Sequence, residues 1–223
     1  MIIFGLPASH SQQGLKPTGS SAAFNKSTVS DIDGNTYKTV IIGKQEWMAE
    51  NLKVTTYNDG TPIQHVRENS AWQGQTSGAY CWYENDSASW GGKYGALYNW
   101  YAINTTSLCP QGWHVAGESE WISLKDYLSA HGYKDTEGTA LKSTTGWGPS
   151  HKNTDNYGFN ALPGGYRHKF GSFSGTGGFG RWWTATQINT HDAWFIYLSK
   201  NRNQVLKRSL SKKNGLYVRC LKN

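Results

Sequence analysis

Cysteine and histidine are the side chains of this sequence best suited to bind metals or to act as nucleophiles. No C-x-x-C pair and no H-x-x-x-H spacing is present, so a zinc site is not predicted. One H-x-x-E, from His65 to Glu68, lies in a loop-like stretch, and we interpret it as chance. His114 follows Trp113, which is typical of a hydrogen-bonded core residue. The seven histidines are His10, His65, His114, His131, His151, His168 and His191.

The three cysteines allow one disulfide and one free thiol. We favour a bond between Cys109 and Cys220, because both lie at the ends of predicted core strands. The alternative is three reduced, buried thiols, with Cys81 as the third.

Neither a Ser-His-Asp arrangement nor a pair of carboxylates is suggested by spacing, so we predict that the protein is not an enzyme. Oxygen-rich stretches occur at 58–60, 84–86 and 153–156. Calcium takes six to eight oxygen ligands, and each stretch supplies two or three. We interpret them as Asx turns that fix loops, with a calcium site as the alternative, and predict no cofactor.

Positive charge is concentrated at the C-terminus. Residues 181–223 contain nine Lys or Arg and one acid, whereas the preceding 180 residues contain thirteen basic and fourteen acidic side chains. The basic residues are scattered through strand-like sequence without a nucleic-acid motif, so nucleic-acid binding is not predicted. Aromatic, β-prone runs at 181–186 and 215–222 frame the tract, as rigid strands frame many binding surfaces.

Composition and periodicity predict an α+β fold. Twenty-six glycines and 37% hydrophobic residues argue against a long helical bundle. Helices are expected at 95–103 and 118–130, the second with Trp121, Leu124, Tyr127 and Leu128 on one face and Gly132 at its end. Strands are expected at 37–42, 47–48, 79–83, 158–168, 171–178, 181–186, 193–199, 204–210 and 216–222.

Residues 1–30 lack periodicity and are rich in Ser, Gly, Ala and Lys, which predicts a flexible arm or linker before a domain at 31–223. The first residues have no basic n-region and too short an apolar run to span a bilayer, so neither a signal peptide nor membrane insertion is predicted. The arm is a candidate docking segment for oligomers.

Six motifs occur in a recognisable order: IIGKQEWMAENLKV at 41–54, YGALYNWYAI at 94–103, CPQGWHVAGESEWISL at 109–124, FNALPGGYRH at 159–168, GRWWTAT at 180–186 and GLYVRCLKN at 215–223. This set closely resembles the Fibrobacter succinogenes major paralogous domain, over residues 31–223.

The resemblance implies a C-type-lectin-like fold, with two helices, short antiparallel sheets and long loops, related to formylglycine-generating enzymes. It implies that the GWHVAGESEW motif is a strand leading into the second helix, and that the last strand pairs near the N-terminal strand. Formylglycine-generating relatives use a C-terminal cysteine pair with copper, and here only Cys220 lies in that region. The E-P-N, Q-P-D and W-N-D strings of calcium-dependent lectins do not occur.

Retroelement-diversified proteins of this fold vary in the C-terminal segment, which here is 187–214. The resemblance therefore implies a solvent-facing patch, which requires Phe195, Tyr197, Arg202 and Leu206 to be exposed and close together. We expect Trp194, Ile196 and Leu198 to point inward, and Trp182 and Trp183 to face opposite sides. Tyr166 is expected to pack inward. The predicted ligand-binding residues are Trp183, Asn189, His191, Asp192, Phe195, Tyr197, Asn201, Arg202, Asn203, Leu206 and Leu210.

We therefore expect a non-catalytic recognition or adhesion domain that binds a glycan or a surface protein, located outside the cell, at a cell surface or on a virion. One alternative is a structural subunit that docks through residues 1–30. Another is a formylglycine-generating-type relative that has lost its catalytic cysteine pair.

Overall fold

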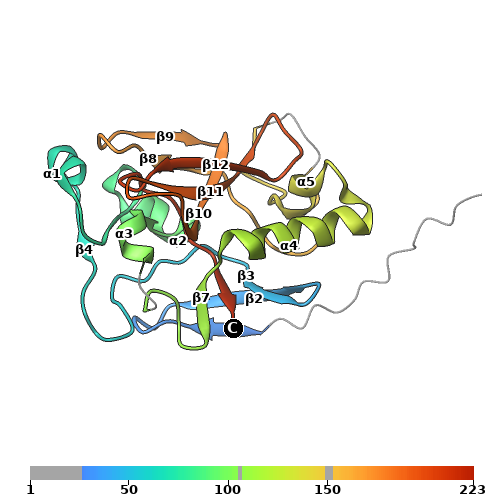
Figure 1. Ribbon diagram of the computed structural model, residues 1–223, viewed down its shortest axis with the longest axis horizontal. Coiled ribbons are helices and arrows are strands. Elements are labelled where there is room, and N and C mark those ends of the chain that lie inside the picture. The colour runs from blue at the N-terminus through green and yellow to red at the C-terminus, as the bar shows by residue number, and fades with distance from the viewer. Residues whose placement is uncertain (1–26, 105–106, 149–152) are drawn as a thin grey trace, which may run out of the picture.

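The first of the sheets joins the two ends of the fold. The computed structural model describes residues 27–104, 107–148 and 153–223, and Figure 1 shows their arrangement. The strand order is β1-β2-β3-β13-β7. Its strands are β1 (Thr28–Ser30), β2 (Thr36–Ile42), β3 (Gln45–Met48), β7 (Trp113–Val115) and β13 (Cys220–Lys222). Because β13 pairs antiparallel with both β3 and β7, the last strand lies beside an N-terminal one, as predicted.

The second sheet holds most of the C-terminal sequence. Its order is β12-β11-β10-β8-β9, antiparallel except for the β8–β10 pair. The strands are β8 (Gly164–Arg167), β9 (Phe173–Thr176), β10 (Phe179–Gln187), β11 (Asp192–Ser199) and β12 (Leu206–Ser211). A small third sheet contains β4 (Gln64–His65), β5 (Ala79–Cys81) and β6 (Leu97–Tyr98).

Helices are more numerous than the two predicted. The described residues contain α1 (Asn69–Gly74), α2 (Gly92–Tyr94), α3 (Trp100–Ile103), α4 (Glu118–Leu128) and α5 (Glu137–Leu141), with helical turns at Tyr83–Asn85, Ser87–Gly91 and Ser129–Tyr133. The helix expected at 95–103 is shorter, because Leu97 and Tyr98 pair with β5. The Oδ1 atom of Asn99 accepts the Ala102 N–H and starts α3 there.

Helix α4 follows strand β7, as the resemblance implied. Glu120 stabilises its first turn, since its Oε2 accepts the Gly117 N–H at 2.6 Å. Trp121, Leu124 and Leu128 are buried and Tyr127 is half-buried against the same core, which confirms the predicted apolar stripe. Gly132 adopts a φ of 92° a few residues beyond the helix, a conformation that favours glycine.

The core lies where α4 separates the two large sheets (Figure 1). Trp121 packs its ring 4.7 Å from Trp47 of β3 and 6.3 Å from Trp182 of β10, measured between ring centroids. All three are almost completely buried. One helix side chain thus joins both sheets, and this contact fixes the second sheet relative to the first.

Strand β1 lies inside the segment predicted as an arm. Thr28 to Ser30 pair with Lys38 to Thr36 of β2, so the sheet begins three residues before the predicted domain boundary at 31. The rest of that prediction, at 1–26, lies outside the described residues. None of the helices described here is long and apolar enough to cross a bilayer.

Candidate functional site

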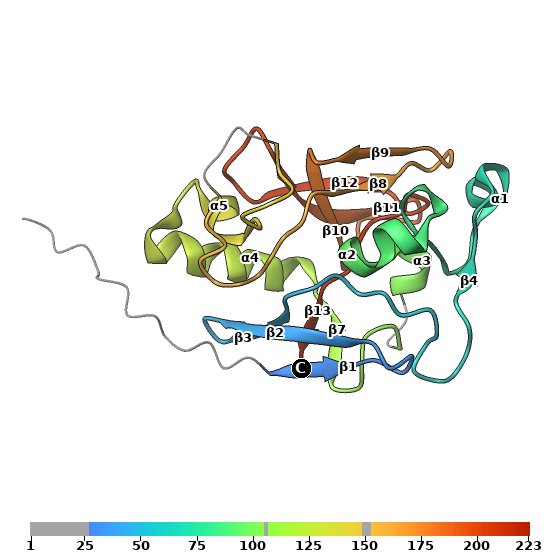
Figure 2. The same ribbon diagram turned by 180° about the vertical axis from the view of Figure 1, so that it is seen from behind.

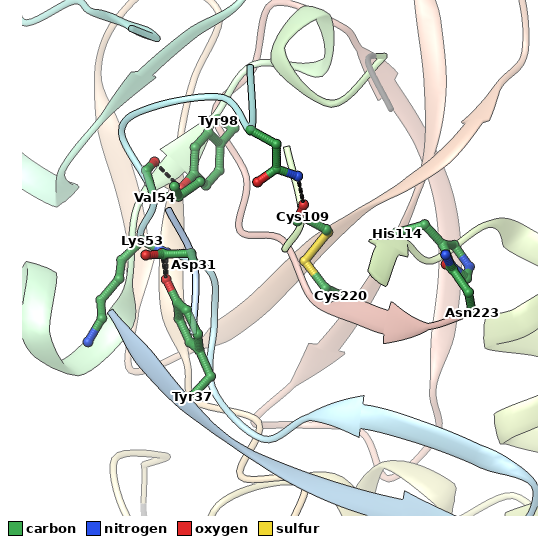
Figure 3. Close-up of a disulfide and its surroundings, with 10 residues drawn as sticks. Asp31, Tyr37, Lys53, Val54, Tyr98, Cys109, His114, Cys220 and Asn223 are labelled. Atoms are coloured by element: carbon green, nitrogen blue, oxygen red, sulfur yellow. Dashed lines mark hydrogen bonds between the residues drawn. A yellow bond between two sulfur atoms is a disulfide. The ribbon is translucent and has the colours of Figure 1, made fainter. Parts of the chain in front are cut away.

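The structure confirms the disulfide between Cys109 and Cys220 (Figure 3). Their Cα atoms are 6.0 Å apart and 111 residues apart in sequence. Cys81 is a free, fully buried thiol, and burial raises its pKa to about 12. At neutral pH it is therefore a protonated core residue and a poor nucleophile.

His114 uses both of its ring nitrogens in side-chain contacts. Nδ1 lies 2.7 Å from Oδ1 of Asn223, and Nε2 lies 2.7 Å from Oε1 of Glu120. The side chain is 39% exposed, so the expectation of a core position is wrong, although the expected hydrogen bonding is present. Across the described ranges no group of three or more His, Cys, Asp or Glu side chains is placed to hold a metal ion.

The oxygen-rich stretches use their carboxylates to fix turns. Asp59 accepts the Thr61 N–H at 2.9 Å, and Asp86 accepts the Ser89 N–H at 3.0 Å. Asp155 accepts the Asn160 N–H at 2.8 Å. These contacts agree with the Asx-turn interpretation of the sequence.

Two hollows adjoin each other beside the disulfide, with volumes of about 640 and 440 Å³, and Trp113 and Asn223 line both. Several polar groups in their walls already have partners. Asp31 accepts the Tyr37 hydroxyl at 2.6 Å, and Asn58 donates to the Cys109 carbonyl (Figure 3). The two hollows are large enough for a ligand, but the hydrogen bonds of these wall groups are used within the fold.

A more distinctive surface lies on the side of the second sheet opposite α4. Register places Arg181, Tyr197 and Leu206 in one row across β10, β11 and β12. The next row contains Trp183, Phe195 and Arg208. Paired residues of neighbouring strands share a face, so both rows point the same way. We call the uncovered part of this side the Arg181 face; it consists of Tyr166, Phe179, Arg181, Tyr197, Leu206 and Arg208.

Arg181 is held at the centre of this face by aromatic rings. Its guanidinium carbon lies 3.8 Å from the Tyr166 ring centroid, 5.1 Å from that of Phe179 and 5.8 Å from that of Phe195. Burial lowers the pKa of Arg181 below its ordinary value, while Tyr166 and Tyr197 act in the opposite direction. Its Nε atom is buried without a hydrogen-bond partner among the described residues.

Comparison with known protein families identifies the family of the chain. A family model described as the Fibrobacter succinogenes major domain matches residues 40–222. The chain belongs to this family. No curated protein and no solved structure matches the chain. The matched range of the Fibrobacter succinogenes major domain includes every strand of the second sheet.

Within this domain the predicted binding residues separate into three places. Trp183, Phe195, Tyr197, Leu206 and Leu210 share one side of the sheet. Asn189, His191 and Asp192 lie at the β10–β11 turn, where Asn189 Oδ1 accepts two backbone N–H groups. Asn201, Arg202 and Asn203 lie beyond the other end of β11, a strand about 27 Å long. The prediction of a single patch is therefore wrong.

Two of those residues are core residues of the domain. Trp183 is 0% exposed, because it lies under β6 and donates from Nε1 to the Tyr98 carbonyl at 2.9 Å. Phe195 is 5% exposed and lies beneath Arg181. Trp182 and Trp183 face opposite sides of β10, as expected, but β10 is covered on both faces there, so neither ring lines the surface. Both are fully buried.

Inward packing was also predicted for two rings that lie nearer the surface. Trp194 shares a face with the buried Ile196 and Leu198 but is only half-buried, with the Lys207 ammonium 4.1 Å from its ring centroid. Tyr166 is half-buried beneath Arg181, so it belongs to the Arg181 face.

Arg202 is separated from the Arg181 face by the path of its loop. Lys142 donates from Nζ to the carbonyls of Ser199 and Arg202, at 2.6 and 2.5 Å. A Cβ at Gly138 of α5 would lie 2.7 Å from the Asn203 carbonyl oxygen, so the loop packs tightly on that helix. Figures 1 and 2 both show this loop beside α5.

The prediction missed Tyr166, Phe179, Arg181 and Arg208 as surface partners. Arg181 precedes Trp183 by two residues and therefore points to the same side of β10. The alternation of side chains along the strand, counted back from Trp183, would have identified Arg181 as a surface candidate. Tyr166 comes from β8, a distant segment, and only the sheet order brings its ring under Arg181.

Proposed function

We propose that this domain is a non-catalytic recognition and adhesion module whose Arg181 face binds a glycan or a surface protein. The observation that carries the proposal is the position of Arg181, a partly dehydrated cation among half-buried rings. In the described residues it has no ion pair with a carboxylate. A ligand would supply the missing acceptor and cover the rings, and Arg and Tyr are enriched at binding hot spots.

The bonding and burial of the cysteines and of His114 support the non-catalytic part of the proposal. Cys220 is bonded to Cys109, and Cys81 is buried with a raised pKa. Both nitrogens of His114 already have partners. Formylglycine-type chemistry requires two adjacent thiolates, and the cysteines of this domain do not supply them.

We propose further that the scaffold is C-type-lectin-like and that 187–214 is a segment of sequence variation among related proteins, as in retroelement-diversified proteins. Support comes from strand β7 leading into the long helix α4, and from the last strand pairing beside β3. The disulfide favours an oxidising location, such as a cell surface, the extracellular space or a virion.

A glycan array and a panel of bacterial surface proteins, each probed with and without a chelator, test the proposal. We expect Tyr197→Ala and Leu206→Ala to weaken binding by about tenfold or more, since both remove contact area from the centre of the face. Arg202→Ala should bind normally because its loop packs on α5. Ile122→Ala is the matched apolar control, since Ile122 is 44% exposed on α4.

Chelation should leave binding unchanged, because no carboxylate belongs to the Arg181 face. Binding that disappears with the chelator, or that survives both substitutions at full strength, would contradict the proposal. Melting curves of the two variants separate a loss of contact from a loss of fold.

A further inference from the structure

The cations of the basic C-terminal tract are not equally available to a ligand. Lys207 pairs with Glu118, and Lys222 pairs with Glu46. Arg219 and Lys212 are buried, and Lys213 donates to the Gln73 carbonyl at 3.0 Å. These five residues serve the fold, although in the sequence they belong to one basic tract at 181–223. Of the other four, Lys200 and Arg202 lie in the β11–β12 loop, and Arg181 and Arg208 lie on the outer side of the second sheet.

Arg181 and Arg208 point from the same side of the sheet. Arg208 is opposite Phe195, Phe195 is opposite Trp183, and Arg181 is two residues before Trp183. Two inter-strand steps and one two-residue step along the strand place their Cα atoms about 12 Å apart. Two long arginine side chains at this spacing can contact one extended ligand.

Neither guanidinium is matched by an acid. The ion pairs within the described ranges involve other residues, and the contact between Arg208 and the Lys207 carbonyl is long, at 3.4 Å. Arg181 is partly dehydrated by the rings of Tyr166 and Phe179. A dehydrated cation gains more from an anionic partner than a fully hydrated one, and guanidinium groups bind carboxylates with two parallel hydrogen bonds.

We propose that the ligand of the Arg181 face is a carboxylate-bearing polysaccharide, a polyuronate, with successive carboxylates on Arg181 and Arg208. This inference rests on the proposed function and specifies its ligand. Tyr197 is half-buried beside Arg181 and offers ring surface and a hydroxyl group to the sugar rings, while the Tyr166 ring lies beneath the Arg181 guanidinium and supports it. Arg181 and Arg208 lie in two neighbouring rows of the face, on β10 and β12, and this spacing across the strands suits an extended chain.

Isothermal titration with oligogalacturonate tests the inference, with its fully methyl-esterified form as the uncharged match. The acid form should bind and the ester should not. Arg181→Gln should weaken binding at least tenfold, and Arg208→Gln several-fold, since each removes one carboxylate contact. Arg181→Lys keeps the charge but loses the paired hydrogen bonds, so it should fall between wild type and Arg181→Gln. Lys134→Gln is the charge-matched control, since Lys134 is exposed beyond α4.

Each outcome decides between the two proposals. Equal binding of acid and ester, or full binding by a folded Arg181→Gln variant, would overturn the polyuronate. Stronger binding of a sulfated than of a carboxylated polysaccharide at Arg181 would overturn the ligand class. If only neutral glycans or proteins bind, and Tyr197→Ala abolishes that binding, the polyuronate is wrong and the recognition function stands. If Tyr197→Ala and Leu206→Ala both leave all binding intact, both proposals fail.

Discussion

Lys142 is a fully buried lysine that joins two parts of the chain. Its side chain is 0% exposed, and Nζ donates to the Ser199 and Arg202 carbonyls while lying 5.1 Å from the Trp147 ring centroid. Burial lowers the pKa of Lys142 to about 8. The ammonium thus holds the β11–β12 loop, at an energetic cost while it is charged.

The depressed pKa predicts a pH dependence of stability. Between pH 8 and 10.5 the unfolded chain binds more protons at Lys142 than the folded protein, so the free energy of unfolding should rise with pH from this group. Denaturation of wild type and Lys142→Met at several pH values measures it. The difference between their free energies of unfolding should be constant below pH 7. Above pH 8 the free energy of unfolding of wild type should rise relative to that of the variant. A difference that stays flat to pH 10 would show an ordinary pKa.

The buried position of Arg219 could not be predicted from its residue type. It is 1% exposed, and its guanidinium donates to Asn51 Oδ1 and to the carbonyls of Met48, Phe159 and Asn160. The sequence shows Arg219 only as one of the nine cations of residues 181–223, because side-chain type and spacing do not show which arginines meet carbonyl groups in the core. The cysteine pair was predicted correctly, but only Cys220 lies at the end of a strand, β13, whereas Cys109 lies in the turn that precedes β7.

At the scale of elements, α4 is the part of the fold most directly predictable from sequence. Its apolar residues recur at helical spacing, and Glu120 lies where an N-terminal turn needs an acceptor. Most of the longer strands were also located, but β1, β4 and β6 were missed, and the exposed faces of the strands were not predicted correctly. Alternation predicts one buried and one exposed face, whereas β10 is covered on both sides at Trp182 and Trp183.

The position of α4 between the sheets predicts a large effect of its central ring. Trp121→Ala should lower the free energy of unfolding by about 3–5 kcal/mol, because it removes contacts to Trp47, Phe159 and Trp182. Ile122→Ala, one residue along the same helix, should change it by about 0.5 kcal/mol or less. Urea denaturation of both variants makes the comparison. Similar losses for the two would mean that α4 does not join the sheets through Trp121.

At the scale of the whole molecule, the disulfide joins two segments 111 residues apart. Its reduction should lower the free energy of unfolding by about 2–4 kcal/mol, since a long covalent loop restricts the unfolded chain. Chemical denaturation with and without reductant measures this loss. Cys81→Ala should remain sensitive to reductant, whereas a variant with Cys109→Ala and Cys220→Ala should not respond. If wild type and both variants lost the same stability on reduction, the loss would not come from the Cys109–Cys220 bond.

The covalent loop also encloses the whole second sheet, because β8 to β12 all lie between Cys109 and Cys220. When tension is applied between the two ends of the described chain, the load passes from β13 through the sulfur–sulfur bond to residue 109. The residues inside the loop cannot be stretched by that load. The fully extended length of the oxidised chain is therefore shorter than that of the reduced chain, by about 3.5 Å for each enclosed residue. The Arg181 face thus lies off the path of mechanical force and can keep its shape while the first sheet is pulled apart.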